Sequence, residues 1–107
     1  MPPADQNPAD PAASRNAETS DKNLEETVCR ICGLDDGELL WDRHGAPQYV
    51  ICDCCRIESG LGDTNLPQVR ENRGYWVAVG APWHDPKRKP NKWDVLEQLS
   101  HIPPEWR

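Results

Sequence analysis

Bulky apolar residues are almost missing from the first 23 positions of the chain, where Met1 is the only one apart from alanine and proline. A segment of this composition cannot bury enough surface to offset an ordering cost of roughly 1–2 kcal/mol per residue. We therefore predict that residues 1–23 form a disordered tail. The rest of the chain, residues 24–107, should form one small domain.

The first part of that domain, residues 24–63, has the pattern of short strands and turns. Residues 38–42 and 48–52 have a strand-like composition, and Asp42, Gly45 and Pro47 mark a turn between them. This pattern predicts a β-hairpin.

The second part, residues 64–107, begins with apolar residues at helical spacing. Leu66, Val69 and Trp76 recur at intervals that place them on one face, and Gly80 is a suitable stop. Thr64 or Asn65 can cap the start of this helix.

A second, shorter helix is expected between residues 93 and 102. Trp93, Leu96, Leu99 and Ile102 would share its apolar face, and the prolines at 103 and 104 would end it.

Composition leaves little material for a core. Hydrophobic residues make up 36% of the chain, phenylalanine is absent, and there are 11 prolines. The mean hydropathy is -0.84. A domain of this size and polarity usually needs a metal ion or disulfides to be stable.

Whether the protein resides in a reducing or an oxidising compartment decides between a metal ion and disulfides. No basic start followed by an apolar run resembles a secretory signal, and no segment approaches the roughly 18 apolar residues of a membrane helix. We therefore expect a cytoplasmic protein that does not enter membranes. Five cysteines, an odd number, in a reducing compartment argue against a disulfide framework.

The cysteine spacing is typical of a zinc site. Cys29 and Cys32 form one Cys-x-x-Cys pair, and Cys52 and Cys55 form another after 19 intervening residues. Two residues between thiolates allow a tight turn to aim both sulfur atoms at one ion, about 2.3 Å away. Four sulfur ligands leave no open coordination position, so the predicted zinc ion is structural. With the hairpin between the pairs, this is the arrangement of a zinc ribbon.

We expect different conformations or roles for three residues next to these ligands. Gly33 follows Cys32 where such a turn commonly needs a positive φ. Arg56 occupies the equivalent place after Cys55, so the second turn should be either more strained or differently shaped. Cys54 lies inside the second pair. We interpret it as a spare thiol, with a metal ligand or a redox sensor as the alternatives.

Five tryptophans are many for so short a chain. Trp41, Trp76 and Trp93 are expected to supply core surface in place of phenylalanine. Trp83 and Trp106 lie in proline-rich segments and are the candidate anchors for a protein partner.

The charge balance opposes nucleic-acid binding without excluding it. The net charge is -6, from 12 basic and 18 acidic residues. A local basic run, which could contact phosphates, consists of Lys87, Arg88, Lys89 and Lys92. No nucleophile–base constellation, phosphate-binding loop or carboxylate pair is recognisable, so no catalytic residue is predicted.

The chain resembles a family of small bacterial cysteine-rich proteins of the CPCC type. The matching blocks cover roughly residues 28–102: VCRICG, WDRHGAPQYVICDCC, ESGLGD, WVAVGAPW and PNKWDVLEQL. The resemblance implies a zinc-ribbon-like module followed by helical segments, with the four cysteines named above as ligands. It also implies that some members act as immunity or accessory partners of toxins.

Together these observations predict a small, metal-stabilised α+β domain with a zinc-ribbon hairpin in residues 24–63 and two short helices in residues 64–107. The expected function is a non-enzymatic, zinc-stabilised protein–protein interaction module, such as an acidic immunity protein against a basic toxin. The alternative is a nucleic-acid-binding zinc ribbon acting in regulation.

Overall fold

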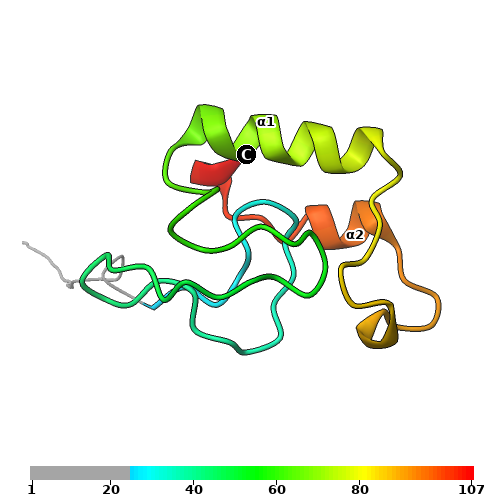
Figure 1. The fold of residues 1–107 in the computed structure, drawn as a ribbon, viewed down its shortest axis with the longest axis horizontal. Helices are drawn as coiled ribbons and strands as arrows, with labels where there is room; N and C mark the ends of the chain where they lie inside the picture. The colour runs from blue at the N-terminus through cyan, green and yellow to red at the C-terminus, as the bar shows by residue number, and fades with distance from the viewer. Residues whose placement is uncertain (1–24) are drawn as a thin grey trace, which may run out of the picture.

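The computed structural model describes residues 25–107, so the predicted tail lies outside the described residues. Figure 1 shows the long helix α1 along one side of the molecule, with the irregular segment before it and the shorter helix α2 on the other. Two short 3₁₀ turns complete the regular structure. In chain order the elements are α1 (Leu66–Ala78), η2 (Pro86–Arg88), α2 (Val95–Leu99) and η3 (Pro104–Trp106).

The predicted zinc-ribbon hairpin, and with it the α+β fold class, is wrong. The part of the chain from residue 25 onward contains isolated β-bridges but no β-strand. Tyr49 explains much of this, because its φ of 56° lies in the left-handed region at the second position of the expected strand 48–52. Trp41 does bridge Pro47, but it also bridges Glu26 from another part of the chain. Residues 25–65 are therefore a series of turns joined by single bridges.

The turn expected within the hairpin does form. Its organiser is Asp42, whose carboxylate accepts hydrogen bonds from the backbone N–H groups of His44 (2.8 Å) and Ala46 (2.9 Å). These bonds lower the pKa of Asp42, with the bond from Ala46 as the largest cause.

Helix α1 begins and ends close to the expected residues. The Asn65 side chain caps it by accepting a hydrogen bond from the N–H of Gln68 at 2.9 Å. Val69 and Trp76 are its buried residues, and Gly80 follows the helix with a φ of 102°. The prediction of this helix is confirmed.

Helix α2 is shorter than expected and turns a different face inward. Asp94 caps it by accepting from the N–H groups of Leu96 and Glu97. Leu96, predicted on the apolar face, is 73% exposed, whereas Gln98 is buried. Leu99 packs partly buried against the core and Ile102 is buried, so only part of the predicted face is correct.

The core is built around cysteines and tryptophans. Trp41, Trp76 and Trp83 are buried in it, and Trp93 packs against it while partly exposed. Trp93 meets the rings of Trp76 and Trp83 edge-on, with centroids 6.4 Å and 5.6 Å away. The expected core roles of Trp41 and Trp76 are thus confirmed, and Trp83 joins them.

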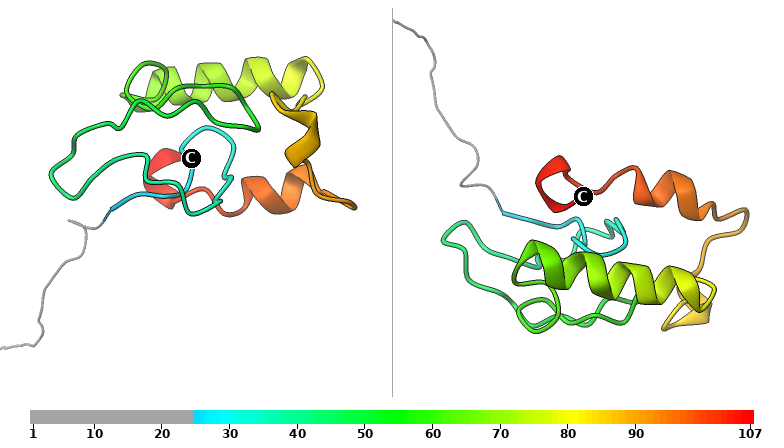
Figure 2. Two further views of the ribbon diagram at one scale, coloured as in Figure 1. Left: turned by 60° about the horizontal axis from the view of Figure 1, so that its bottom comes forward. Right: turned by 90° about the horizontal axis from the view of Figure 1, so that it is seen from above.

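A buried arginine joins the start and the end of the described chain. The guanidinium of Arg30 lies between the rings of Trp41 and Trp106, 3.9 Å from each centroid. It also donates two hydrogen bonds to the carboxylate of Glu26 (2.9 and 2.8 Å) and one to the carbonyl of Asp63 (2.8 Å). Both views in Figure 2 show the C-terminal segment beside the start of the described chain.

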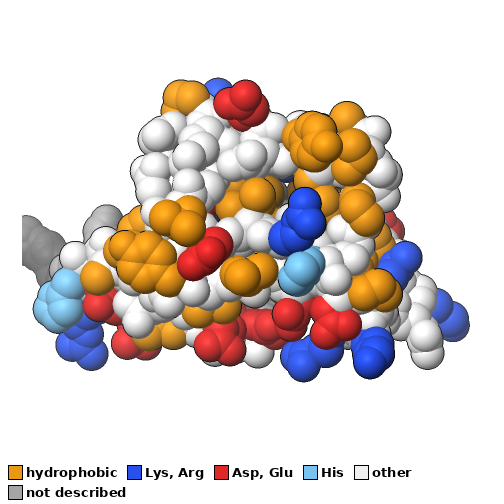
Figure 3. Space-filling view, in the orientation of Figure 1, with side chains coloured by type: hydrophobic (Ala, Val, Ile, Leu, Met, Phe, Trp, Pro, Cys, Tyr) orange, Lys and Arg blue, Asp and Glu red, His pale blue; other side chains and the backbone are white. Residues whose placement is uncertain are grey.

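Large apolar side chains also remain on the surface. Figure 3 shows hydrophobic side chains gathered over the C-terminal part of α1 and over the irregular segment. The exposed ones are Tyr49, Ile51, Leu61, Tyr75, Val77, Val79 and Leu96. Within residues 25–107, no helix has the length and apolar character needed to cross a membrane.

Candidate metal centre

The first cysteine pair lies in a tight loop, residues 29–34, which we call the first cysteine loop. Two backbone hydrogen bonds close it: Gly33 N–H to Cys29 O at 2.9 Å, and Cys29 N–H to Leu34 O at 2.8 Å. Gly33 has a φ of 87°, as expected from the sequence. A side chain at this position would be strained, because L-residues avoid this region.

The second pair repeats this geometry in residues 52–57, the second cysteine loop. Here Arg56 N–H donates to Cys52 O at 3.0 Å, and Cys52 N–H donates to Ile57 O at 3.1 Å. Arg56 stands where the first loop has glycine, and its φ is 75°. Of the two expected alternatives, a more strained or a differently shaped turn, the structure has the strained one, at a typical cost of about 1–2 kcal/mol.

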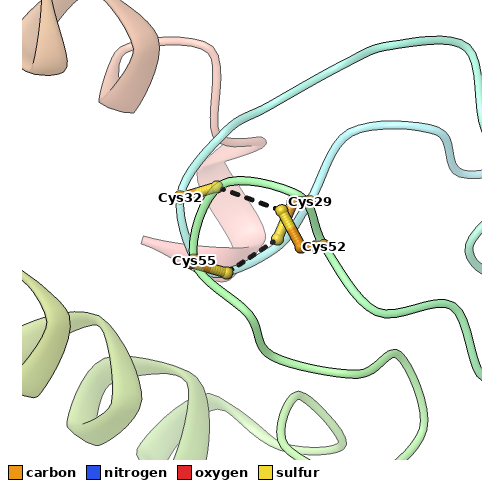
Figure 4. Close-up of side chains that lie close together, drawn as sticks. All are labelled: Cys29, Cys32, Cys52 and Cys55. Atoms are coloured by element: carbon orange, nitrogen blue, oxygen red, sulfur yellow. Dashed lines mark hydrogen bonds between the residues drawn. The ribbon is translucent and has the colours of Figure 1, made fainter. Parts of the chain in front are cut away.

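The two loops face each other and bring four sulfur atoms together (Figure 4). The Sγ atoms of Cys29 and Cys55 are 3.7 Å apart, as are those of Cys32 and Cys52. All four lie within 4.8 Å of one another. A regular tetrahedron with metal–sulfur bonds of 2.3 Å has sulfur atoms about 3.8 Å apart. The four side chains therefore fit a tetrahedrally coordinated metal ion.

Burial supports the same conclusion. The four cysteines are 5%, 0%, 7% and 6% exposed, in chain order. An ion between them would be surrounded by sulfur and shielded from water, without a position for a substrate. Such a closed site has a structural role in proteins that bind zinc this way.

Three of the four thiols have shifted pKa values. Hydrogen bonds from neighbouring thiols, with that from Cys29 the largest, bring the pKa of Cys52 far below its ordinary value. The same sharing of protons, again led by Cys29, raises the pKa values of Cys32 and Cys55. Without a cation the buried cluster thus disfavours ionisation of Cys32 and Cys55. A divalent ion supplies the charge that permits these thiols to ionise, so metal binding should release protons.

Gln98 connects helix α2 to the two loops. Its side-chain Nε2 lies 3.2 Å from the carbonyl oxygen of Cys32 and 3.3 Å from the Sγ of Cys54, and its Oε1 accepts from the indole N–H of Trp93 at 2.8 Å. The backbone of α2 also packs closely against the first cysteine loop: a Cβ placed on Gly33 would lie 2.1 Å from the carbonyl oxygen of Gln98. Sequence reasoning missed Gln98, since a single polar residue in a short amphipathic helix carries no distinguishing signal.

Cys54 is fully buried and lies outside the group of four. Its Sγ accepts the hydrogen bond from Gln98, and its backbone carbonyl accepts from His84 N–H at 2.9 Å. A hydrogen bond from Cys32 is the main cause that lowers the pKa of its thiol. The spare thiol of the sequence interpretation is thus a packed residue beside the cluster.

Arg73 closes the first cysteine loop from the side of α1. Its guanidinium donates to the carbonyl of Ile31 at 2.7 Å and to that of Arg30 at 2.8 Å, and it also donates to the carbonyl of Trp106. Burial lowers the pKa of Arg73, whereas the nearby thiols of Cys29 and Cys32 oppose that change. A positive charge near the sulfur atoms would partly offset the net charge of about -2 of a zinc tetrathiolate.

The two candidate partner anchors have roles inside this domain. Trp83 is only 8% exposed, and Trp106 is stacked on Arg30. A partner that used either indole would have to displace these contacts. The prediction of a protein partner is itself neither supported nor opposed by them.

The basic run is partly engaged as well. Arg88 lies 3.8 Å from the carboxylate of Asp53, and the ammonium of Lys89 lies 5.3 Å from the centroid of Trp93. The Asp53 carboxylate partly offsets the positive charge that a phosphate backbone would meet. Nucleic-acid binding through Lys87, Arg88, Lys89 and Lys92 stays a prediction.

Comparisons with protein-family models, with curated proteins and with solved structures found no match to this chain. The resemblance to CPCC-type proteins therefore also stays a prediction. What the structure establishes is a group of four buried cysteines that can hold a metal ion.

Proposed function

We propose that this chain is a non-enzymatic interaction module whose fold is held together by one zinc ion bound to Cys29, Cys32, Cys52 and Cys55. The observation that carries the proposal is the set of four buried sulfur atoms, all within 4.8 Å of one another and two pairs of them 3.7 Å apart. A four-sulfur tetrahedral site suits zinc or iron, and zinc is the common structural choice in paired Cys-x-x-Cys loops. Zinc bound in this way would hold the two loops together in a segment, residues 25–65, that has only isolated β-bridges.

The interaction role rests on the surface. The exposed aromatic and aliphatic side chains over α1 and the irregular segment offer contact area of the kind found in protein interfaces. The net charge of -6 would favour encounter with a basic partner through electrostatic steering. A toxin-neutralising protein directed against a basic toxin is one form of such a module, and it is the form that the CPCC resemblance suggests.

Two measurements test this proposal separately. Elemental analysis and native mass spectrometry of the purified protein should find one zinc ion per chain. An iron-loaded protein would show thiolate-to-iron charge-transfer absorption in the visible range, which zinc lacks, and would contradict the choice of metal. A metal-free, folded protein would contradict the centre itself.

The partner is tested by mild crosslinking and affinity purification of the full chain from its native host. We expect one basic protein to be enriched in stoichiometric amount, and to be lost when Tyr75, in α1, and Leu61, in the irregular segment, are replaced by serine. Replacing Asn91, an exposed and uncharged polar residue, by serine is the control. A preparation without any stoichiometric partner, from cells in which the chain is expressed, would contradict the interaction role.

A further inference from the structure

A groove of about 510 Å³ lies between α1 and the second cysteine loop. This volume is within the range of small-molecule sites, about 300–1,000 Å³. Its lining is largely aromatic and aliphatic, with Tyr75, Trp76, Val79, Pro82 and Trp83 as the main contributors. Tyr75 and Val79 are 71% and 52% exposed, so the upper edge is open to solvent.

Two basic groups border this apolar lining. Arg56, from the second cysteine loop, and His84, from the segment after α1, both line the groove and are both exposed. Among residues 25–107, neither side chain has a hydrogen-bonding or ion-pairing partner. In Figure 3 a basic side chain and a histidine lie next to each other, directly below the hydrophobic group over α1. The pair is available to an external anion.

The backbone holds both groups in place. The His84 N–H donates to the carbonyl of Cys54 at 2.9 Å, and the next N–H, of Asp85, donates to the carbonyl of Asp53 at 2.8 Å. Arg56 is fixed by the hydrogen bond that closes its own loop. The two basic side chains thus project from segments tied to the same cysteine loop.

The conformation of Arg56 is an independent observation. With a φ of 75°, this position would accept glycine without strain, as Gly33 does in the first loop at 87°. At Gly33 the backbone of Gln98 leaves no room for a side chain, whereas Arg56 is exposed and borders the groove. Strained residues of this kind cluster at ligand-binding sites, because the cost is tolerated where the side chain has a task.

Trp83, one of the residues that line the groove, carries an unused donor. Its indole N–H is buried and has no acceptor within the described part of the chain. A buried donor without a partner costs about 1–3 kcal/mol. A ligand oxygen that reached this N–H would remove that cost.

From these features we propose that the groove binds a small carboxylate with a flat apolar body, such as an aromatic carboxylic acid. The guanidinium of Arg56 matches the two oxygens of a carboxylate, and His84 supplies a second donor. The flat body would lie against the aromatic lining. The overall charge of -6 repels large polyanions, but a single negative charge responds mainly to the Arg56 guanidinium beside it. A small monoanion is therefore favoured over a nucleic acid or an acidic protein.

This site goes beyond the proposed interaction role and does not require a protein partner. The test is titration of the zinc-loaded full chain with 2-naphthoate, followed by ¹H–¹⁵N correlation spectroscopy including the tryptophan indole signals. We expect saturable shifts at groove residues, the Trp83 indole among them, with a Kd on the order of 1 mM or tighter for a ligand of this size. The neutral 2-naphthamide, with the same rings, should bind about tenfold more weakly.

Arg56→Gly is the matched variant, because it removes the guanidinium and relieves the backbone strain. We expect it to keep the zinc ion and a dispersed spectrum while 2-naphthoate binding weakens about tenfold or more. Arg43→Gly changes the net charge equally at an exposed position outside the groove and should leave the Kd unchanged. If Arg56→Gly fails to fold, Arg56→Gln tests the same charge.

Two results would overturn the proposal. One is equal binding of 2-naphthoate and 2-naphthamide, or an unchanged Kd after removal of the Arg56 charge, since carboxylate recognition would then be absent. The other is a lack of shifts at groove residues up to about ten times the expected Kd.

Discussion

Replacing Gly33 by alanine should be the most damaging single-methyl change in the chain. Gly33 closes the first cysteine loop with a φ of 87°, and helix α2 packs directly against it. An ideal Cβ at this position lies 2.1 Å from the carbonyl oxygen of Gln98, whereas real Cβ atoms essentially never come within 3.0 Å of such an atom. The loop or the helix would have to move by about 1 Å, because the contact is with backbone and no rotamer relieves it.

The magnitude follows from two separate costs. A left-handed conformation costs a non-glycine residue about 1–2 kcal/mol, and the loss of glycine's freedom in the unfolded chain returns about 0.4–1 kcal/mol. Overpacking against fixed atoms adds about 1–3 kcal/mol. The sum is a loss of about 1–5 kcal/mol in the free energy of unfolding, with a midpoint of about 3 kcal/mol, which is a large share of the stability of a small domain. Since Gly33 follows a predicted ligand, the affinity for zinc should fall with it.

Gly37 provides the matched control. Its φ is 86°, but a Cβ there would meet no atom within 4 Å. Gly37→Ala therefore carries the conformational cost alone, and we expect a loss below about 1.5 kcal/mol. The assay is urea unfolding of the zinc-loaded variants followed by circular dichroism, with zinc content measured in parallel. Equal losses for the two variants would refute the claim that α2 is packed against the first cysteine loop.

Three further predictions concern the centre and the core. Cys29→Ser should abolish stoichiometric zinc binding and unfold the irregular segment, because structural zinc contributes about 10–16 kcal/mol in small domains. Cys54→Ser, in contrast, should retain zinc, as measured by elemental analysis. Acid should release zinc and unfold the protein together, because zinc binds deprotonated thiols and protons compete with it for the sulfur atoms, so that the stabilisation is present at neutral pH and lost as the pH falls. Zinc release without a loss of ellipticity would contradict this. Trp106→Ala should lower the free energy of unfolding by about 2–4 kcal/mol, because the ring stacked on Arg30 is lost. Trp106→Phe keeps an aromatic ring and should lower it by less than half of that. Equal losses for the two variants in thermal unfolding would contradict a role for the stacked ring.

Local sequence signals predicted the local features well. The Cys-x-x-Cys spacing identified the four residues that meet in space, and Asn65 and Gly80 marked the limits of α1, because capping and loop closure depend on a few neighbouring residues. The positive φ at Gly33 followed from the same reasoning, whereas that reasoning leaves the shape of the second turn at Arg56 open. Features that depend on contacts distant in sequence were less accessible. The bridge between Trp41 and Glu26 has no local signature.

Buried polar residues were the second source of error. Arg30, Asp63 and Gln98 are all less than 10% exposed, although such residues are normally assigned to the surface. Each is buried because it has partners supplied by distant segments: aromatic rings for Arg30, the indole of Trp41 for Asp63, and a cysteine loop for Gln98. Trp106 was interpreted as a partner anchor for the same reason, since the arginine it covers lies far away in the sequence.

The two cysteine loops share their hydrogen-bond geometry but differ in their surroundings, and this difference indicates a division of roles. The first loop is enclosed: α2 packs on Gly33, Arg73 binds its carbonyls, and Arg30 inside it is buried between two rings. A change there disturbs the core. The second loop instead carries the exposed Arg56 and holds His84 by a backbone bond, at the edge of the groove. Because both loops contribute two ligands to the same proposed ion, zinc would fix the groove edge to the rigid side of the domain. Loss of the metal should therefore abolish carboxylate binding even under conditions in which helix α1 survives.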